Sequence, residues 1–185
     1  MTPAAPATFD APATVEGPAA RVLVVGYGST LRGDDGVGPR AAELARADRR
    51  LAGATVLVRH QLTPELAADV AAARLVVLVD ARADAESGAV VEERVAGAVS
   101  SGVPNGPAGV GPGGPTGGGA STHHVGAAEV AALASDLWGA RPDVFTVGVG
   151  AASFEVGDGL SAVVEHALPA AVDAIAALVA EHGHA

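Results

Sequence analysis

The sequence contains no cysteine, and this absence removes several kinds of chemistry at once. Disulfide bonds, zinc–thiolate sites, iron–sulfur clusters and a cysteine nucleophile all require the thiol group. Any metal ion held by this chain must therefore be bound through His, Asp, Glu or backbone oxygen atoms. A ligand set of carboxylate and imidazole groups suits nickel, zinc or manganese.

Basic and aromatic residues are also scarce. The 11 Lys and Arg residues stand against 21 Asp and Glu residues, which gives a formal net charge of −10. Phosphate backbones and anionic lipid surfaces repel such a protein, so we expect no nucleic-acid partner and no membrane partner. Aromatic residues make up 3% of a chain that is 49% hydrophobic and rich in alanine, which predicts a tightly packed core of small side chains.

A long apolar run and a secretory signal are both missing from the sequence. No continuous apolar run reaches the roughly 20 residues that a membrane-spanning helix needs. Residues 1–20 show no basic stretch followed by an apolar one, as a secretory signal would. They are rich in Ala, Pro and Thr, which predicts a disordered tail. These features favour a cytoplasmic protein.

The apolar segments alternate between short β-branched runs and longer Ala- and Leu-rich stretches with helical spacing. We expect strands at residues 21–26, 54–60, 74–81, 88–95 and 143–151, and helices at residues 36–48, 63–73, 125–138 and 160–182. The alternation predicts a single α/β domain over residues 21–185, a three-layer α/β/α sandwich with a mostly parallel twisted sheet. A Gly/Pro-rich segment at residues 97–120 reads as an inserted loop.

Three details of these elements can also be predicted. The segment 88–95 separates its apolar and charged sides poorly, which is typical of an edge strand. Thr63 followed by Pro64 predicts a helix N-cap at Thr63. Pro169 is expected to kink or divide the terminal helix.

Polar residues follow the predicted strands at their carboxyl ends, where α/β sheets place their functional crevice. These residues are Ser29, Asp34, Asp35, His60, Gln61, Asp80, Arg82 and Asp84. Ser121, Thr122, His123 and His124 stand before the helix that follows the inserted loop and are expected to join the same cluster. Asp80 ends an apolar run, so its carboxylate is partly desolvated unless it is paired or bound to a metal, which favours a functional role. The other three histidines, His166, His182 and His184, are expected to face solvent.

Asp34 and Asp35 leave two interpretations open. Adjacent residues cannot share a helix face, so one carboxylate can cap the following helix while the other points into the crevice. Alternatively, both simply lie at a helix N-terminus, where a carboxylate is stabilised by about 0.3–1 kcal/mol.

A dinucleotide-binding loop is a third interpretation of the same segment. Gly26 and Gly28 begin a G-x-G-x-x-G pattern, but Leu31 occupies the third glycine position. Two carboxylates would face the pyrophosphate, although Arg59 could bind a 2′-phosphate. An NADP-binding module therefore stays as a less favoured alternative.

Four motifs in register, GYGSTLRGDDGVG, HQLTPEL, VVLVDA and STHHVG, resemble those of the hydrogenase maturation endopeptidases. Members of that family remove a short C-terminal extension from the nickel-containing large subunit of nickel–iron hydrogenases. The resemblance covers the chain from about Arg21 to the terminal helix, without the tail and the inserted loop. It implies an endopeptidase, a hydrolase of peptide bonds, whose partner is the precursor of a hydrogenase large subunit.

The resemblance also implies which residues carry the function. Asp35, Asp80 and His123 fall on the family's acid, acid, histidine trio, which makes them both the catalytic residues and the metal ligands. The metal would be nickel carried by the precursor, although other divalent ions can occupy such a site. Asp34 would then be the helix-capping neighbour, and Ser29 stands where the family usually has asparagine.

The resemblance leaves further points as expectations. The HQLTPEL segment, which begins at His60, would line a substrate channel beside the site. A non-catalytic maturation chaperone that binds metal or precursor on the same fold is an alternative function, and Ser29 is its support. We expect a monomer, because the predicted helices show no additional apolar face.

Overall fold

The computed structural model describes residues 22–95, 125–157 and 159–183. The predicted tail at residues 1–20 and the predicted inserted loop at residues 97–120 both lie outside these ranges. His123, His124 and His184 also lie outside the described residues.

A five-stranded sheet forms the middle layer, with the strand order β2-β1-β3-β5-β4. The strands are β1 (Val22–Tyr27), β2 (Thr55–Arg59), β3 (Leu75–Arg82), β4 (Val90–Arg94) and β5 (Asp143–Gly150). β1, β2, β3 and β5 run parallel, whereas β4 pairs antiparallel with β5 at the edge. The predictions of a mostly parallel sheet and of an edge strand near residues 88–95 are confirmed.

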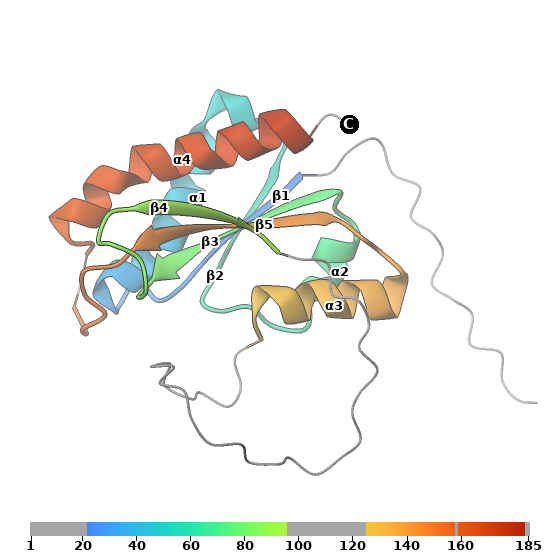
Figure 1. The fold of residues 1–185 in the computed structure, drawn as a ribbon, viewed down its shortest axis with the longest axis horizontal. Helices are drawn as coiled ribbons and strands as arrows, with labels where there is room; N and C mark the ends of the chain where they lie inside the picture. Colours follow the sequence, from blue (N-terminus) through green and yellow to red (C-terminus); the bar gives the residue numbers. More distant parts are fainter. Residues whose placement is uncertain (1–21, 96–124, 158, 184–185) are drawn as a thin grey trace, which may run out of the picture.

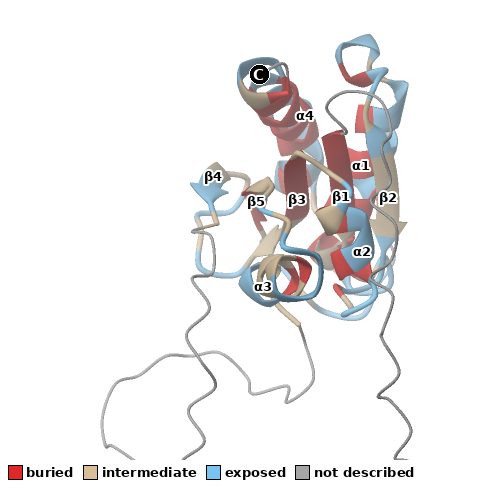
Figure 2. Ribbon diagram, turned by 90° about the vertical axis from the view of Figure 1, so that its right-hand side faces the viewer, coloured by how far each residue is buried: buried red, intermediate tan, exposed pale blue. Residues whose placement is uncertain are grey.

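Helices cover both faces of the sheet (Figure 1). α1 (Val37–Ala47) and α4 (Ala162–His182) pack on one face, and α2 (Leu66–Ala71) and α3 (Ala127–Trp138) pack on the other. Strand alternation divides the core between them, since Val24 belongs to the α1/α4 side and Val25 to the α2/α3 side. Buried residues line the sheet and the sides of the helices that face it (Figure 2). The predicted three-layer α/β/α sandwich is confirmed.

Two predicted details of the helices, the N-cap at Thr63 and a division of the terminal helix at Pro169, are wrong, whereas the alternative of a kink at Pro169 stays a prediction. α2 begins at Leu66, not beside Thr63, because residues 63–66 form a tight turn in which the Leu66 N–H donates to the Thr63 carbonyl. Pro169 does not divide the terminal helix, since α4 is continuous over 21 residues. Proline removes one N–H donor, but the flanking Leu168 and Ala171 are buried against the core and hold the helix in place.

α4 is long and apolar enough to cross a membrane by length and composition alone. Its apolar residues are nevertheless part of the core that α1 and the sheet share with it. A core helix of an α/β fold passes the same test, so the packing of α4 accounts for its hydropathy.

α1 approaches β1 so closely that two glycines of the first motif have no room for a side chain. A Cβ atom at Gly26 would lie 2.0 Å from the carbonyl oxygen of Gly38. A Cβ atom at Gly38 would lie 2.2 Å from the Tyr27 oxygen and 2.4 Å from the Val79 oxygen. These glycines therefore serve close packing between helix and strand.

Gly38→Ala is expected to lower the free energy of unfolding by about 3 kcal/mol, because the new methyl group overlaps two backbone carbonyls that cannot rotate away. Gly53→Ala is the matched control, since a Cβ atom there meets nothing within 4 Å. Its effect should stay within about 0.5 kcal/mol. Urea denaturation of both variants measures the difference, and equal stabilities would contradict the close contact.

Candidate functional site

The carboxyl ends of β1 and β3 bring Tyr27 and Asp80 side by side. Gly26 pairs with Val79, so the next residue on each strand faces the other across the sheet. Tyr27 packs against the apolar cluster on the α2/α3 side, and Asp80 follows Leu78 of that cluster by two residues, which places both side chains on this face. The Tyr27 phenol and the Asp80 carboxylate are therefore close enough for each to influence the pKa of the other.

Asp80 lies in an environment that disfavours its charge. Burial is the largest influence and raises the pKa of its carboxyl to about 6, and the negative charge of Asp35 raises it further. The hydrogen bond from the Ala81 N–H, at 2.7 Å, and the neighbouring Tyr27 phenol act in the opposite direction. A carboxylate that is partly desolvated beside a like charge is typical of a functional site.

Asp35 approaches Asp80 from the loop between β1 and α1. The Ser29 N–H donates to its Oδ2 atom at 2.8 Å, which fixes the carboxylate in the turn. Gly28 permits this turn through a positive φ of 131°, and a Cβ atom there would lie 2.0 Å from the Asp35 carbonyl oxygen. The structure thus brings two of the predicted site residues, Asp35 and Asp80, into electrostatic contact.

The side chain of Asp34 points toward the loop between β5 and α4 and is fully buried, at 0% exposure. Its Oδ2 atom accepts hydrogen bonds from the Ala152 N–H at 2.8 Å, the Ser153 N–H at 3.0 Å and the Ser161 hydroxyl at 2.9 Å. Its Oδ1 atom accepts from the Ser161 N–H at 2.6 Å. The prediction that Asp34 caps the helix following it is wrong, since no side-chain cap is formed there.

The pKa of Asp34 reflects this arrangement. Burial by itself would raise it, but the hydrogen bonds from Ser161, Ala152 and Ser153 outweigh burial and hold the pKa of Asp34 below its ordinary value. Asp34 therefore acts as an ionised anchor that ties the loop between β5 and α4 to the loop that carries Asp35.

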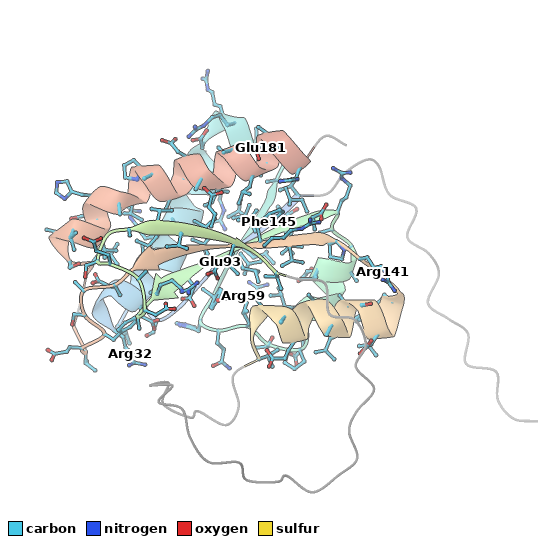
Figure 3. The ribbon with its side chains drawn as sticks, viewed as in Figure 1. Arg32, Arg59, Glu93, Arg141, Phe145 and Glu181 are labelled. Atoms are coloured by element: carbon cyan, nitrogen blue, oxygen red, sulfur yellow. The ribbon has the colours of Figure 1, made fainter. Side chains whose placement is uncertain are left out.

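The two tied loops present an exposed apolar pair beside the carboxylates. The Gly157 N–H donates to the Leu31 carbonyl and the Gly33 N–H to the Gly157 carbonyl, so the loops run together as a short ledge. Leu31 is 63% exposed and Val156 is 89% exposed on this ledge. Figure 3 shows Arg32, which neighbours Leu31, beyond the carboxyl ends of the parallel strands.

The loop between β1 and α1 has few donors left for a phosphate group. Almost all of its backbone N–H groups already have partners within the protein. These are the N–H groups of Gly28, Ser29, Leu31, Arg32, Gly33, Asp34 and Asp35. A dinucleotide loop instead aims such N–H groups at the pyrophosphate, so the NADP-binding alternative is not favoured.

The ligands for a metal ion are incomplete within the described part of the chain. Residues 22–95, 125–157 and 159–183 contain no group of three His, Asp or Glu side chains that could hold a metal ion. Asp35 and Asp80 supply two carboxylates, and the third predicted ligand, His123, lies outside these residues. Two carboxylates and one imidazole fit the preferences of nickel.

Comparison with known proteins identifies the fold. No family model and no curated protein matches the chain. The NiFe hydrogenase maturation protease HycI from Thermococcus kodakarensis KOD1 superposes with a TM-score of 0.62 at 20% identity, over 87% of this chain and 93% of that one. The hydrogenase 2 maturation peptidase from Thaumarchaeota archaeon SCGC_AB-539-E09 gives 0.58 at 23% identity, over 87% and 97%. The fold is that of the hydrogenase maturation proteases.

A further structure with the maturation protease fold is the hydrogenase maturating endopeptidase HybD from E. coli, with a TM-score of 0.57, 20% identity, and coverage of 88% of this chain and 94% of that one. Identities of 20–23% establish a shared architecture. The fold expected from the four motifs is therefore confirmed.

Ser29 supports the site through its backbone in this version of the maturation protease fold. Its N–H holds Asp35, while its hydroxyl lies 3.4 Å from the Leu31 N–H of the same turn. A backbone donor is present whatever the side chain, so serine in place of asparagine leaves the support of Asp35 intact. This removes the observation that favoured a non-catalytic chaperone.

Other predicted site residues lie at the rim or belong to the core. Arg82 pairs with Asp84 at 2.7 Å and with Glu93 at 2.8 Å, so its charge is largely engaged there. In the HQLTPEL segment, His60 and Gln61 are exposed, whereas Leu62 is buried. Part of this segment therefore builds the core, and its role in a substrate channel stays a prediction.

Two histidines outside the site can be compared with their predictions. His166 is exposed as expected. His182 was expected to face solvent, but its ring stacks on Phe145 with the centroids 4.7 Å apart. The closing turn of α4 lies over β5, so the histidine ring covers a strand residue that would otherwise contact water.

Sequence reasoning missed Tyr27 as a member of the site. The residue ends a β-branched strand, and its partner Asp80 comes from a strand 53 positions later along the chain. A polar aromatic residue at the end of a central strand is the signal that could have indicated it.

Proposed function

We propose that this protein is an endopeptidase that removes the C-terminal extension of a nickel-loaded hydrogenase large-subunit precursor. The observation that carries the proposal is the pair of carboxylates, Asp35 and Asp80, held together at the strand ends of a maturation protease fold. Structures with this fold bear the names of maturation proteases and endopeptidases.

The two carboxylates suit a cation that arrives with the substrate. One oxygen of Asp35 accepts the Ser29 N–H and one oxygen of Asp80 accepts the Ala81 N–H, so each carboxylate retains acceptor capacity. Two neighbouring negative charges repel each other, and a divalent cation between them removes that repulsion. In this proposal the nickel of the precursor binds Asp35 and Asp80, with His123 as the third ligand.

Hydrolysis then adds water across the scissile peptide bond, with hydroxide bonding to the acyl carbon and a proton passing to the leaving amine. Nickel bound with the substrate would supply Lewis-acid polarisation of the carbonyl or of the attacking water. In an alternative form of the proposal Asp80 is the general base in place of being a nickel ligand, because with a pKa of about 6 it is mostly ionised at neutral pH and can accept the proton of that water.

The surface beside the carboxylates suits a macromolecular substrate. Leu31 and Val156 are exposed on a ledge that its own hydrogen bonds hold in shape, so little ordering is needed when an apolar segment of the precursor binds there. The proposal includes a cytoplasmic location and action as a monomer, with the precursor as the partner.

Processing of the precursor tests the proposal directly. Purified protein is incubated with nickel-loaded and nickel-free precursor, and mass spectrometry measures the precursor mass. We expect shortening of the loaded form alone. Asp35→Asn and His123→Ala should lower the rate by more than about 100-fold, because even residues that only support a metal ligand are worth about 10–100-fold.

Asp136→Asn serves as the matched control, because Asp136 is an exposed aspartate on α3. This variant should process the loaded precursor at the rate of the unmodified protein. A loaded precursor whose mass stays unchanged would overturn the endopeptidase proposal, and binding of that precursor without shortening would indicate a chaperone.

A further inference from the structure

The ledge carries a cation as well as its two exposed apolar side chains. Arg32 is exposed, and its backbone forms a bridge with Gly157, the residue that follows Val156. Leu31 directly precedes Arg32, so the apolar side chains of Leu31 and Val156 and the guanidinium group all extend from one short stretch of paired backbone.

The ledge begins directly beside the Asp35 carboxylate. The Ser29 N–H donates to Asp35 at 2.8 Å, and the Leu31 N–H lies 3.4 Å from the hydroxyl oxygen of the same serine. Further along, the Asp34 N–H donates to the Ser153 carbonyl at 3.1 Å and fastens the two loops together. A ligand that extends from Asp35 onto the ledge would therefore meet a surface whose shape is already fixed, which lowers the entropic cost of binding.

The charge of Arg32 has no counterion within the described part of the chain. Most arginines at the surface pair with a carboxylate, and those that do are Arg40, Arg50, Arg82 and Arg94. Glu155 is exposed next to Val156, but no ion pair joins it to Arg32 among these residues. In a protein with a formal charge of −10, an uncompensated guanidinium group next to the site is the feature that attracts an anionic group.

The size of this surface matches a short extended peptide. Successive residues of an extended chain are about 3.3 Å apart, so two or three residues span two apolar side chains and one cation. The C-terminal extension of the precursor is a segment that can lie there, because it continues from the scissile bond that the proposed reaction places at Asp35 and Asp80.

We infer that the ledge binds the C-terminal extension of the precursor, with an acidic side chain of the extension on Arg32 and a neighbouring apolar side chain on Leu31 and Val156. This inference rests on the proposed function and adds the chemistry by which the substrate is selected. The contacts lie away from the reacting atoms, so they strengthen binding of the precursor and leave the hydrolysis step unchanged.

Arg32→Gln tests the charged contact, and Arg141→Gln is the matched control, since Arg141 is also exposed but lies at the opposite end of the molecule (Figure 3). With nickel-loaded precursor we expect KM to rise about 3-fold in Arg32→Gln, the size typical of an exposed ion pair, while kcat is unchanged. Arg141→Gln should keep the KM of the unmodified protein. Replacing the Asp and Glu residues of the extension with Asn and Gln should abolish the difference between Arg32→Gln and the unmodified protein. Equal KM values for these two proteins with the original precursor would overturn the inference.

Leu31→Ala tests the apolar contact. Leu137→Ala is its control, because Leu137 is 64% exposed, against 63% for Leu31, and lies near the end of α3 that leads into the amino end of β5. We expect KM to rise about 5-fold in Leu31→Ala, because apolar area is no longer buried against the extension. Both side chains are exposed, so both variants should melt close to the unmodified protein. A KM in Leu31→Ala no higher than in Leu137→Ala would contradict the apolar contact.

Binding measurements separate this inference from the proposed function. Isothermal titration calorimetry gives the Kd of nickel-loaded precursor for the unmodified protein and for Arg32→Gln. If the unmodified protein binds the precursor without shortening it, the proposed function fails, and a Kd about 3-fold larger in Arg32→Gln still supports the ledge as the binding surface. Equal Kd values would overturn the inference, whether or not the precursor is shortened.

Discussion

Replacing Asp80 with asparagine is expected to abolish processing and at the same time to raise the free energy of unfolding by about 2–3 kcal/mol at pH 8. The protein keeps a carboxylate in a place where its charge is unfavourable, because burial and Asp35 raise the pKa of Asp80 from 3.8 to about 6. Asparagine has nearly the same shape and carries no charge, so the unfavourable interaction disappears together with the function.

The sign of this effect follows from proton binding. Between about pH 4 and pH 6 the folded protein retains the Asp80 proton that the unfolded chain releases, so the stability of the unmodified protein falls as pH rises through this window. Asp80→Asn lacks this contribution, and its advantage should therefore be small at pH 4 and complete above pH 6.

Urea denaturation at pH 4, 6 and 8 measures the stability difference, and Asp136→Asn is the control for loss of an exposed charge. A purely structural Asp80 would give the opposite outcome, a variant that is less stable at pH 8. A gain in stability with a loss of processing indicates a residue retained for function at the expense of folding.

Asp34→Asn is expected to lower the free energy of unfolding by about 4 kcal/mol at pH 7, because a buried charge with several hydrogen-bond donors is replaced by an amide. The four donors around Asp34 suit two acceptor oxygens. The NH₂ group of asparagine would face some of these donors and leave them without a partner.

The contribution of Asp34 to the free energy of unfolding changes with pH in the opposite direction to that of Asp80. The pKa of Asp34 is held below its ordinary value, so its contribution to stability is present above pH 4 and is lost as pH falls through the folded-state pKa. The difference in free energy of unfolding between Asp34→Asn and the unmodified protein should therefore become smaller at acidic pH. Chemical denaturation at pH 7 and pH 3 measures this difference.

Asp35→Asn is the matched control for Asp34, because the two aspartates are adjacent in the sequence. Asp35 accepts a hydrogen bond from the Ser29 N–H, so its replacement should cost about 1 kcal/mol of stability. Its main effect should be on processing. Similar stability losses at both positions would contradict the division of roles between anchor and ligand.

The sequence by itself determined the architecture and located one side of the site. Buried parallel strands read as runs of β-branched residues and helices as Ala- and Leu-rich stretches, and both patterns are local, so the predicted elements coincide with the observed ones to within a few residues. Asp35 and Asp80 could be placed at the strand ends because parallel strands all present their carboxyl ends at the same edge of the sheet.

The tertiary structure alone decided what the polar groups do there. Asp34 binds residues 118–127 positions away, and no local pattern indicates that the loop before α4 folds back over the first motif. Tyr27 meets Asp80 through the pairing of β1 with β3, and His182 meets Phe145 through the packing of α4 over β5. Such partners depend on how distant elements pack together, and a sequence pattern carries information only about neighbours along the chain.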